Sequence, residues 1–371
     1  MRNLSRVIIL WFFLATPKIG WTQGDGPKEY SYTHPIPFQP NTYVSYFTET
    51  PITIDGVIDK EEWEKIAWTD KFVDIEGQNK PNPFLDCRAK ITWDNEYLYF
   101  AAHLEEPHIW ATLTEHDAIM FHDDDFEVFI DPDGDGHQYF ELEMNAFNSI
   151  WDLYMLYPYY MDDRRNYIMN WNIKGLKSAV HIEGSLNDGS DEDEYWSLEL
   201  AIPWSTFKDF KKGEGKPEVG DQWRMNFSRV DWPVKAINGK YEKLKDDNEK
   251  NLPERNWVWS PTGYINMHKP ETWGYIQFEK DHNVAFQKYP DEDFKWDLWQ
   301  IFYKVKECWK SEGQNCALNQ MDIPNHMSIS DINLSINSEG FFISISSKNG
   351  NIYTLNHLGR LTSTVQKAIR K

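Results

Sequence analysis

Two neighbouring segments, 125–131 and 139–145, alternate acidic or polar residues with apolar ones. This period of two predicts a pair of half-buried strands, and the turn formers between them predict a hairpin centred near Gly134. In that register Glu127 lies directly across from Glu143, on the mainly acidic face that also carries Phe129. Like charges opposed across a strand pair are destabilising. A metal ion, an arginine, ligand hydroxyls or a shared proton would compensate them, and a solvated, loosely charged face is the alternative.

Other polar residues extend this acidic face. Asp125, Glu141 and Asn145 have the same parity on the hairpin as the two glutamates. A strand that follows later in the chain directs Arg224 and Asn226 outward. Arg224 and Arg229 are both candidates to neutralise the acids, and the outward position of Arg224 favours it. The candidates for ligand binding are therefore Asp125, Glu141, Asn145, Arg224 and Asn226, together with the opposed glutamates.

The opposed glutamates also allow a catalytic interpretation. Strand residues directly opposite each other have Cβ atoms within about 5 Å, and retaining glycoside hydrolases use two carboxyl groups about 5–5.5 Å apart. Glu127 and Glu143 could therefore hydrolyse an O-glycosyl bond. This hydrolase is the alternative to a binding site that has no catalytic residues.

The predicted turn of the hairpin contains a possible calcium loop. Asp131, Asp133 and Asp135 place carboxylates at alternate positions, and Gly136 follows them. This order resembles the start of a calcium-binding loop, but the twelfth position is Leu142 and the flanking segments are strands, which excludes an EF-hand. A structural Ca²⁺ held by the three aspartates and a plain acidic turn remain equal alternatives.

The composition narrows the class of ligand. The 371 residues include 38 Lys and Arg against 59 Asp and Glu, a net charge of −21, with 18 Trp, 19 Tyr and 21 Phe. Such an acidic chain is a poor partner for nucleic acid or anionic membranes. Carboxylates accept hydrogen bonds from sugar hydroxyls and aromatic rings stack on sugar C–H faces, so the combination suits neutral polyhydroxylated ligands. The alternative for most of these rings is an aromatic-rich β core.

The N-terminus predicts export. Residues 1–23 combine a basic start, a short apolar run over 7–14 and a polar end, the pattern of a signal peptide that is too short to span a membrane. No later apolar run approaches the roughly 18 residues that a spanning helix needs. We therefore expect a secreted or periplasmic protein. In an oxidising compartment, Cys308 and Cys316 are expected to form a local disulfide.

The rest of the chain divides into three predicted regions. Residues 24–45 are polar and proline-rich and are predicted to be a linker. Many short strands with few helices over 46–280 predict a mainly β fold, an antiparallel β-sandwich of the immunoglobulin or DOMON-like kind. Residues 281–371 predict a small α/β appendage, with a helix over 291–312 and a hairpin around Asn349-Gly350.

One short helix is expected near the start of the sandwich. Asp59 stands where a residue could cap a helix, and Glu62 follows three positions later in the capping-box arrangement. Trp63 would then lie on the buried stripe of that helix.

Five pieces of sequence, in order, carry a resemblance to a known family. The segments 54–63, 91–99, 124–131, 198–204 and 273–274 are together similar to the family 9 carbohydrate-binding module and its DOMON-like relatives. The resemblance implies a β-sandwich that binds sugars and often holds structural calcium. It also implies a role beside glycoside hydrolases in polysaccharide breakdown.

The resemblance also implies site residues. Glu127 falls at the position of a glutamate that binds sugar in the best-known branch of the family. Phe121 and Met267 occupy the positions of two tryptophans that clamp the sugar, and Glu141 occupies that of an arginine. His268 belongs to a loop that closes over the site in the family.

Three functions are therefore carried forward. The first is a secreted, non-catalytic carbohydrate-binding protein with a poly- or oligosaccharide as its ligand and glycoside hydrolases as possible partners. The second is the glycoside hydrolase described above. The third is a haem-binding electron-transfer domain, because relatives of this sandwich bind haem and Met267 and His268 could approach an iron atom.

Overall fold

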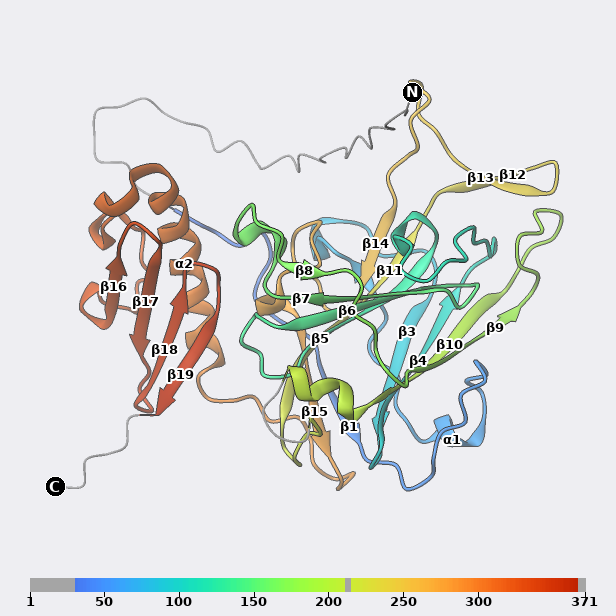
Figure 1. Cartoon of the computed structure of the whole chain (residues 1–371), viewed down its shortest axis with the longest axis horizontal. Coiled ribbons are helices and arrows are strands. Elements are labelled where there is room, and N and C mark those ends of the chain that lie inside the picture. The colour runs from blue at the N-terminus through green and yellow to red at the C-terminus, as the bar shows by residue number, and fades with distance from the viewer. Residues whose placement is uncertain (1–30, 211–214, 366–371) are drawn as a thin grey trace, which may run out of the picture.

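The computed structural model describes residues 31–210 and 215–365, so the predicted signal peptide, 1–23, lies outside the described residues. Figure 1 shows a β-sandwich beside a smaller C-terminal unit of one helix and one sheet. The described chain is mostly β, as predicted from the sequence.

The larger sheet of the sandwich has nine strands. Its main path runs β1-β15-β11-β5-β6-β7-β8, with β14 paired to β11 and β2 paired to β14. Neighbouring strands are antiparallel except β1 and β15, which are parallel. The strands are β1 Thr42–Tyr46, β2 Val73–Asp74, β5 Asp125–Asp131, β6 Tyr139–Asn145, β7 Ile150–Met155, β8 Tyr167–Ile168, β11 Gln222–Asp231, β14 Arg255–Val258 and β15 Gly274–Glu279.

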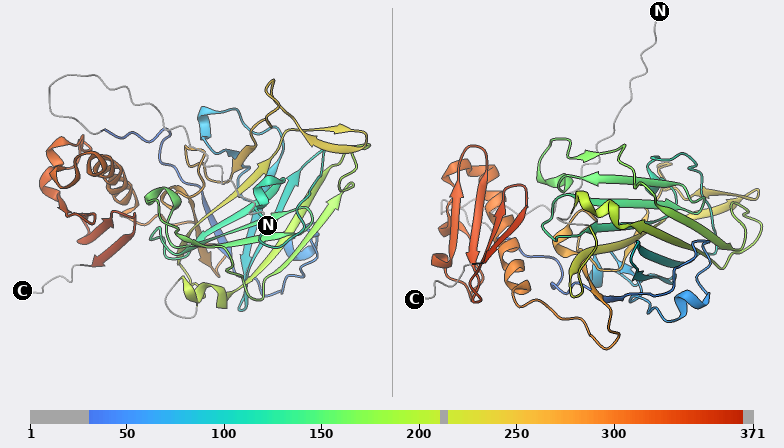
Figure 2. Two further views of the ribbon diagram at one scale, coloured as in Figure 1. Left: turned by 45° about the horizontal axis from the view of Figure 1, so that its top comes forward. Right: turned by 60° about the horizontal axis from the view of Figure 1, so that its bottom comes forward.

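The second sheet has four antiparallel strands in the order β3-β4-β10-β9 and packs on the first (Figure 2). A separate hairpin of β12 and β13 projects from the end of the sandwich (Figure 1). The strands are β3 Cys87–Trp93, β4 Tyr97–Glu105, β9 Lys177–Glu183, β10 Tyr195–Pro203, β12 Val234–Ile237 and β13 Lys240–Lys243. Short 3-10 helices lie at Gly77–Asn79, Met120–His122, Tyr159–Met161, Trp204–Asp209, Pro270–Thr272, Gly313–Asn315, Leu318–Gln320 and Ile329–Asp331.

The β5–β6 hairpin has the register predicted from its alternating sequence. Its apolar side chains are buried in the main core with residues of the second sheet, because burial of each such side chain stabilises the fold by roughly 1.5–3 kcal/mol. The confirmed pairs are Phe126 with Met144, Val128 with Leu142, and Ile130 with Phe140. The same register places Glu127 opposite Glu143 on the face that points away from the second sheet.

Two predicted features near the N-terminus need correction. The stretch 24–45, predicted as a linker, contains most of β1, which pairs with β15. The first strand of the sheet therefore begins at Thr42, before the predicted start of the sandwich at residue 46. The helix expected from Asp59 is the single turn α1, Glu61–Glu64, and no side chain caps it. It ends early because the N–H of Thr69 donates to Ala89 O and draws the chain alongside β3.

The C-terminal unit is larger than the predicted helix and hairpin. Helix α2, Glu292–Glu312, packs on a four-stranded antiparallel sheet in the order β16-β17-β18-β19. The sheet contains β16 Ile332–Ile336, β17 Phe341–Ser346, β18 Asn351–Asn356 and β19 Leu361–Val365. The predicted hairpin is β17–β18, and the two outer strands were not predicted.

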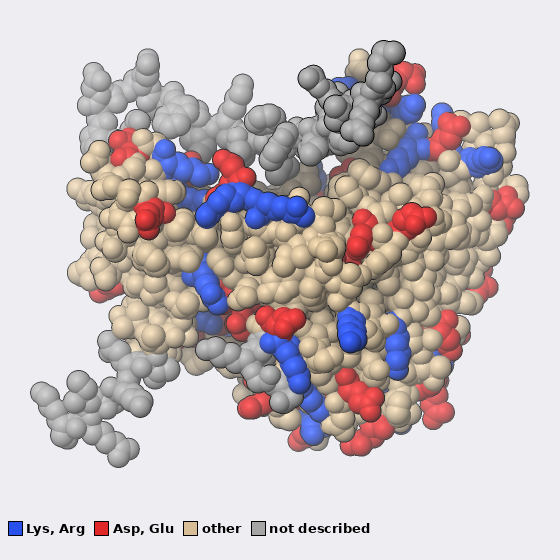
Figure 3. All heavy atoms as spheres, in the orientation of Figure 1, with Lys and Arg blue, Asp and Glu red and all other residues tan. Residues whose placement is uncertain are grey.

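Charge is distributed over the surface rather than gathered on the face drawn in Figure 3, where Lys and Arg side chains lie among Asp and Glu. The acidic excess of the sequence therefore does not form one continuous patch on this face. Among the described helices, none has the length and apolar character needed to cross a membrane.

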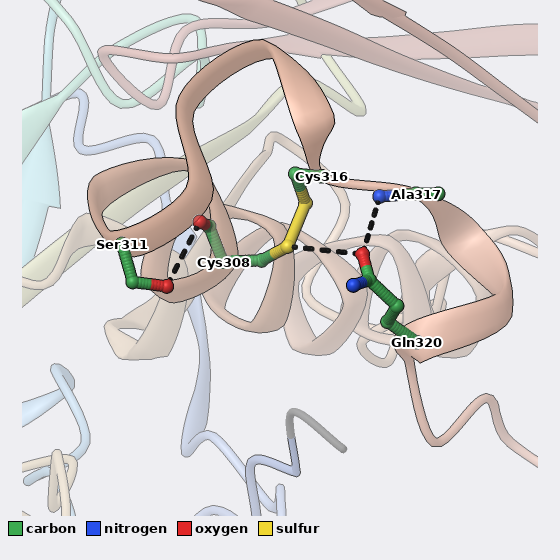
Figure 4. The surroundings of a disulfide bond; sticks show 5 residues. All are labelled: Cys308, Ser311, Cys316, Ala317 and Gln320. Atoms are coloured by element: carbon green, nitrogen blue, oxygen red, sulfur yellow. Dashed lines mark hydrogen bonds between the residues drawn. A yellow bond between two sulfur atoms is a disulfide. The ribbon is translucent and has the colours of Figure 1, made fainter. Parts of the chain in front are cut away.

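Cys308 and Cys316 form the predicted disulfide, with their Cα atoms 5.6 Å apart. Figure 4 shows the bond joining the last turn of α2 to the segment that follows it, where Gln320 accepts the N–H of Ala317 at 2.8 Å. The disulfide closes a short loop at the end of the helix. Cys87 is free and buried, in accordance with its apolar surroundings.

The C-terminal unit docks on the sandwich through specific contacts, and both views of Figure 2 show the two side by side. Arg360 Nε donates to Asp135 Oδ2 at 2.8 Å, and the ring of His137 lies 2.9 Å from Leu358 O. The N-terminal segment adds a stack of Phe38 on Trp296 of α2, with ring centroids 4.2 Å apart. The unit therefore covers the turn of the β5–β6 hairpin.

Candidate functional site

A pocket of about 450 Å³ opens on the face of the larger sheet that points away from the second sheet. It combines acidic side chains with aromatic ones, and none of its lining residues is a lysine or an arginine. The acids are Glu127, Glu141, Glu143 and Glu254, and the aromatic residues are Phe121, Phe129, Trp151, Tyr159 and Tyr160. The loop 265–268 closes one side, and Ile75, Val230 and Asn256 complete the lining.

Alternation along the strands places these side chains. Glu127 and Phe129 of β5 face the same way as Glu141 and Glu143 of β6, and Trp151 of β7 pairs with Glu143. The opposite parity of each strand fills the sandwich core. The pocket floor is therefore the polar face of the same strands that build the core.

The acids of the floor are crowded and buried. Asp125, Glu127 and Glu143 each offer a carboxylate oxygen, and these three atoms lie within 4.8 Å of one another. Asp125 is 0% exposed, Glu143 2% and Glu127 6%. Asp125 lies beneath the lining, so it belongs to the acidic cluster but not to the pocket surface.

Burial and mutual repulsion keep protons on this cluster. Burial raises the pKa of Glu127 to about 7, and burial together with the charge of Glu127 raises that of Glu141 to about 8. Burial, followed by the neighbouring carboxylates, also raises the pKa of Glu143 and of Asp125 well above their usual ranges. At neutral pH the four acids cannot all be ionised unless a cation joins them.

His268 stands beside the acids as a neutral ring. Its Nδ1 lies 2.8 Å from the hydroxyl of Tyr139, and its Nε2 lies 3.7 Å from Glu141 Oε2. Burial lowers the pKa of His268 to about 3. The ring therefore offers hydrogen bonding, not charge, to a ligand in the pocket.

The two residues predicted at the clamp positions also reach the site. The N–H of Phe121 donates to Glu143 Oε2 at 3.1 Å, and the residue as a whole is 37% exposed in the pocket lining. Met267 is largely buried, and its carbonyl accepts the indole N–H of Trp273 at 2.7 Å. Phe121 is therefore available to a ligand, whereas Met267 mainly holds the loop.

Besides Asp125, three predicted site residues lie outside the pocket lining. Arg224 donates to Trp273 O and lies 3.6 Å from Glu292 of α2, so it does not neutralise the acidic face. The reason is register, since Ser228 and not Arg224 is opposite Glu127.

The two predicted asparagines have structural contacts. Asn145 donates to Leu113 O at 2.8 Å and to Asp123 Oδ2 at 3.0 Å. Asn226 donates to Ser260 O at 2.8 Å and accepts the N–H of the same residue. Their parity is as predicted, but their side chains hold loops rather than face the pocket.

Several lining residues were not predicted. Trp151 could have been found by extending the alternation to a third strand, because it pairs with Glu143. Tyr159, Tyr160 and Glu254 come from loops, where no local periodicity indicates which way a side chain points.

Helix α2 supports the loops of the pocket from outside. Lys269 is buried, and its ammonium donates to the hydroxyl of Tyr303 at 2.8 Å and lies 4.6 Å from the ring centroid of Tyr160. The hydroxyl of Tyr303 in turn donates to Glu271. The C-terminal unit thus holds both the 159–161 turn and the loop after 265.

The acidic turn predicted to bind calcium has its own internal partners. Asp131 accepts the N–H of Gly134 at 3.0 Å and that of Gly136 at 2.9 Å, and Asp135 pairs with Arg360. The carboxylate oxygens of Asp131, Asp133 and Asp135 do lie within 4.8 Å of one another. Calcium here stays a prediction, and these contacts favour the plain acidic turn.

A β-sandwich with a pocket of acids and aromatic rings defines a class of proteins suited to polyhydroxylated ligands. Residues 54–280, well over half of the chain, match the sequence profile of the family described as "Carbohydrate family 9 binding domain-like". The protein belongs to this family, as the resemblance of its sequence motifs predicted.

Solved structures with similar folds include two of a family 9 carbohydrate-binding module from Caldicellulosiruptor kristjanssonii. The complex with cellotriose is 16% identical over 67% of this chain and 100% of that one, with a TM-score of 0.41. The complex with glucose is 14% identical over 66% and 100%, with a TM-score of 0.41. A putative carbohydrate-binding protein from Bacteroides uniformis is 16% identical over 65% and 100%, with a TM-score of 0.47. No curated protein matches the chain.

Proposed function

We propose that this protein is a secreted, non-catalytic carbohydrate-binding protein whose pocket holds part of a poly- or oligosaccharide. The observation that carries the proposal is the pocket itself, in which strands and loops bring four glutamates and five aromatic residues together over one sheet face within the family domain. The signal-like start of the sequence supports export. Family membership supports a role beside glycoside hydrolases in polysaccharide breakdown.

The pocket offers two complementary kinds of contact. Glu127 and Glu141 line the floor, where carboxylates can accept hydrogen bonds from sugar hydroxyls. Phe121 and Tyr159 are 37% and 39% exposed as whole residues, and both line the pocket, where their rings can stack on the C–H face of a sugar ring. A neutral sugar would therefore accept contacts of two kinds: hydrogen bonds with polar groups at the pocket floor, and stacking on aromatic rings at the pocket edge.

Isothermal titration calorimetry of the full chain against mono- and oligosaccharides tests this proposal. Glucose and cellotriose come first, because they occupy similar family 9 modules. Glu127→Gln should weaken binding roughly tenfold or more, because hydrogen bonds to a charged acceptor are among the stronger ones. Tyr159→Ala should weaken it by removing a stacking surface. The matched control is Glu64→Gln on the exposed surface of α1, which should bind as the wild type does.

Absence of saturable binding to a broad panel of glycans would refute the sugar-binding proposal. Retention of full affinity in both pocket variants would refute its location. Either result would leave the sandwich with a different ligand.

One observation keeps the glycoside hydrolase as the second candidate function. Carboxylate oxygens of Glu127 and Glu143 lie within 4.8 Å, near the separation that retaining enzymes use. Glu143 is almost fully buried, and its Oε2 already accepts the N–H of Phe121, so it offers less to a substrate than Glu127 does. Incubation of each sugar with the protein, followed by product analysis, decides the matter. Turnover that Glu127→Gln abolishes would replace the binding proposal with catalysis.

The third hypothesis, a haem-binding electron-transfer domain, can be tested by an absorbance spectrum. Met267 and His268 are adjacent in sequence, and His268 Nε2 faces Glu141 across 3.7 Å. This arrangement does not provide ligands on opposite faces of one iron. Purified protein without a Soret band would remove this alternative.

A further inference from the structure

Side chains able to hold a metal ion gather at four places in the described part of the chain. Three of these clusters already have compensating partners. The cluster of Glu106, Asp124 and Asp231 is paired with Arg229 and Arg255. The turn of the β5–β6 hairpin is paired with Arg360. In the third, His116 Nε2 lies 3.8 Å from Asp117 Oδ1 and 3.5 Å from Asp152 Oδ1, so this cluster contains its own cation when the histidine is protonated.

Among the described residues, no lysine or arginine is paired with the fourth cluster, which consists of Asp125, Glu127 and Glu143. The pocket above it contains no lysine or arginine among its lining residues. Asp125 is 0% exposed, and its Oδ2 has no hydrogen-bond partner. Oε2 of the neighbouring Glu141 also lacks a hydrogen-bond partner. A buried carboxylate oxygen without a partner is strongly disfavoured, so these atoms point to a missing positive group.

The geometry matches a particular kind of ion. Three oxygens that are at most 4.8 Å apart can all lie within about 2.8 Å of a common centre. Calcium binds carboxylate oxygens at about 2.3–2.6 Å in flexible geometry, which small side-chain rotations would reach. Magnesium needs about 2.0–2.1 Å and a near-ideal octahedron, and zinc sites usually include nitrogen or sulfur donors. The all-oxygen, loosely spaced donor set therefore favours calcium.

We propose that Asp125, Glu127 and Glu143 bind one calcium ion at the floor of the pocket. The ion neutralises most of the charge of the three carboxylates. Its binding to them does not require a sugar. Its open coordination positions face the pocket, where hydroxyls of the ligand can complete them. This last step rests on the proposed sugar binding, whereas the ion site does not.

Calcium titration of the chelator-treated full chain by calorimetry, without sugar, tests the site. We expect saturable binding that weakens at least tenfold in Asp125→Asn. The matched control is Asp133→Asn, which removes a carboxylate from the acidic turn of the hairpin and should leave the affinity unchanged. Absence of calcium binding by the wild type would overturn the proposal. Loss of binding in Asp133→Asn but not in Asp125→Asn would also overturn it and would assign the ion to the turn. Tighter binding of magnesium or zinc would overturn the choice of ion.

Thermal unfolding provides a second readout that does not depend on the fit of a binding isotherm. In chelator, Asp125→Asn should melt at or above the wild-type temperature, because it removes a buried carboxylate that has no cationic partner, while the amide oxygen can still accept the N–H of Val230. Calcium should raise the melting temperature of the wild type but not of the variant. If Asp125→Asn in chelator melts at a lower temperature than the wild type, or does not fold, the proposal is contradicted. The carboxylate would then stabilise the metal-free fold.

The two proposals can fail separately. Tyr159→Ala should lose sugar affinity yet retain calcium, because its ring lines the pocket and is not part of the acidic cluster. Calcium binding without binding of any sugar would refute the proposed function and leave the ion site standing. If the protein binds sugar equally well with and without chelator and does not bind calcium, the ion site is refuted and the proposed function stands.

Discussion

Lys306 of α2 is a lysine buried between the C-terminal unit and the sandwich. Its ammonium donates to Met161 O at 3.1 Å and lies 3.0 Å from Met161 Sδ. It also lies 5.5 Å from the ring centroid of Tyr160, a residue that lines the pocket. The charge of this lysine is therefore coupled to the docking of α2 against the turn that bounds the pocket.

The stability change expected from Lys306 follows from its pKa. Burial, reinforced by Lys310 and Lys269, lowers that pKa from 10.5 to about 7. Between these two pH values the unfolded chain binds more protons than the folded one, so the free energy of unfolding rises as the pH rises. At about 1.36 kcal/mol per pKa unit, the full gain across this window is on the order of 4 kcal/mol.

Urea unfolding of the wild type and of Lys306→Met at pH 7 and pH 10 measures this effect. At pH 7 the wild type carries nearly the whole cost of the buried charge, and by pH 10 most of it is relieved. The stability of the wild type relative to the variant should therefore improve by roughly 3–4 kcal/mol between the two pH values. Lys348→Met, in the exposed turn between β17 and β18, is the control and should show little pH dependence relative to the wild type. Equal pH dependence of the wild type and Lys306→Met would refute the reasoning.

Two further substitutions test buried features of the fold. Arg229→Met should lower the free energy of unfolding by about 3–5 kcal/mol, because it leaves the buried Glu106 and Asp231 without this counter-charge; a loss below about 1 kcal/mol in urea unfolding would contradict the assigned pairing. Cys308→Ser should cost about 2–3 kcal/mol, since the bond to Cys316 closes a loop of sequence separation 8. Reductant should destabilise the wild type by a similar amount and leave the variant unchanged, and an unaffected wild type would argue against the bond.

The sequence predicted the acidic face well because that prediction needs only local information. Alternation with period two and a turn near Gly134 set both the register and the parity of β5 and β6, including the opposition of Glu127 and Glu143. Local information was not sufficient to predict the position of Arg224. Its parity was right, but its position relative to Glu127 depends on how β11 pairs with a strand about a hundred residues earlier.

The aromatic residues that line the pocket show more clearly that sequence patterns do not report contacts between distant segments. Tyr159 and Tyr160 lie on one 3-10 turn. Tyr160 contacts Lys269 and Tyr303 of α2, and the ring of Tyr159 packs on His268. No periodic pattern in a loop reports such contacts, because they join residues that are far apart in the sequence. The two outer strands of the C-terminal sheet differ in this respect. Strand β16 alternates Ile332, Leu334 and Ile336 with polar residues, so its period of two could have identified it. Strand β19 has three polar residues between Leu361 and Val365, and no apolar alternation indicates a strand there.

The sequence by itself determined the class of the fold, the inward and outward faces of the central hairpin, the helix α2 and the disulfide, because each depends on neighbours along the chain. The family motifs likewise indicated the domain that the profile match covers. Only the tertiary structure decided which charges are compensated. Glu106 and Asp231 receive Arg229 and Arg255 from the packing of distant segments, whereas Asp125 receives no cation. Sequence spacing cannot distinguish these cases, since the energy of a buried charge depends on what lies within a few ångströms in space.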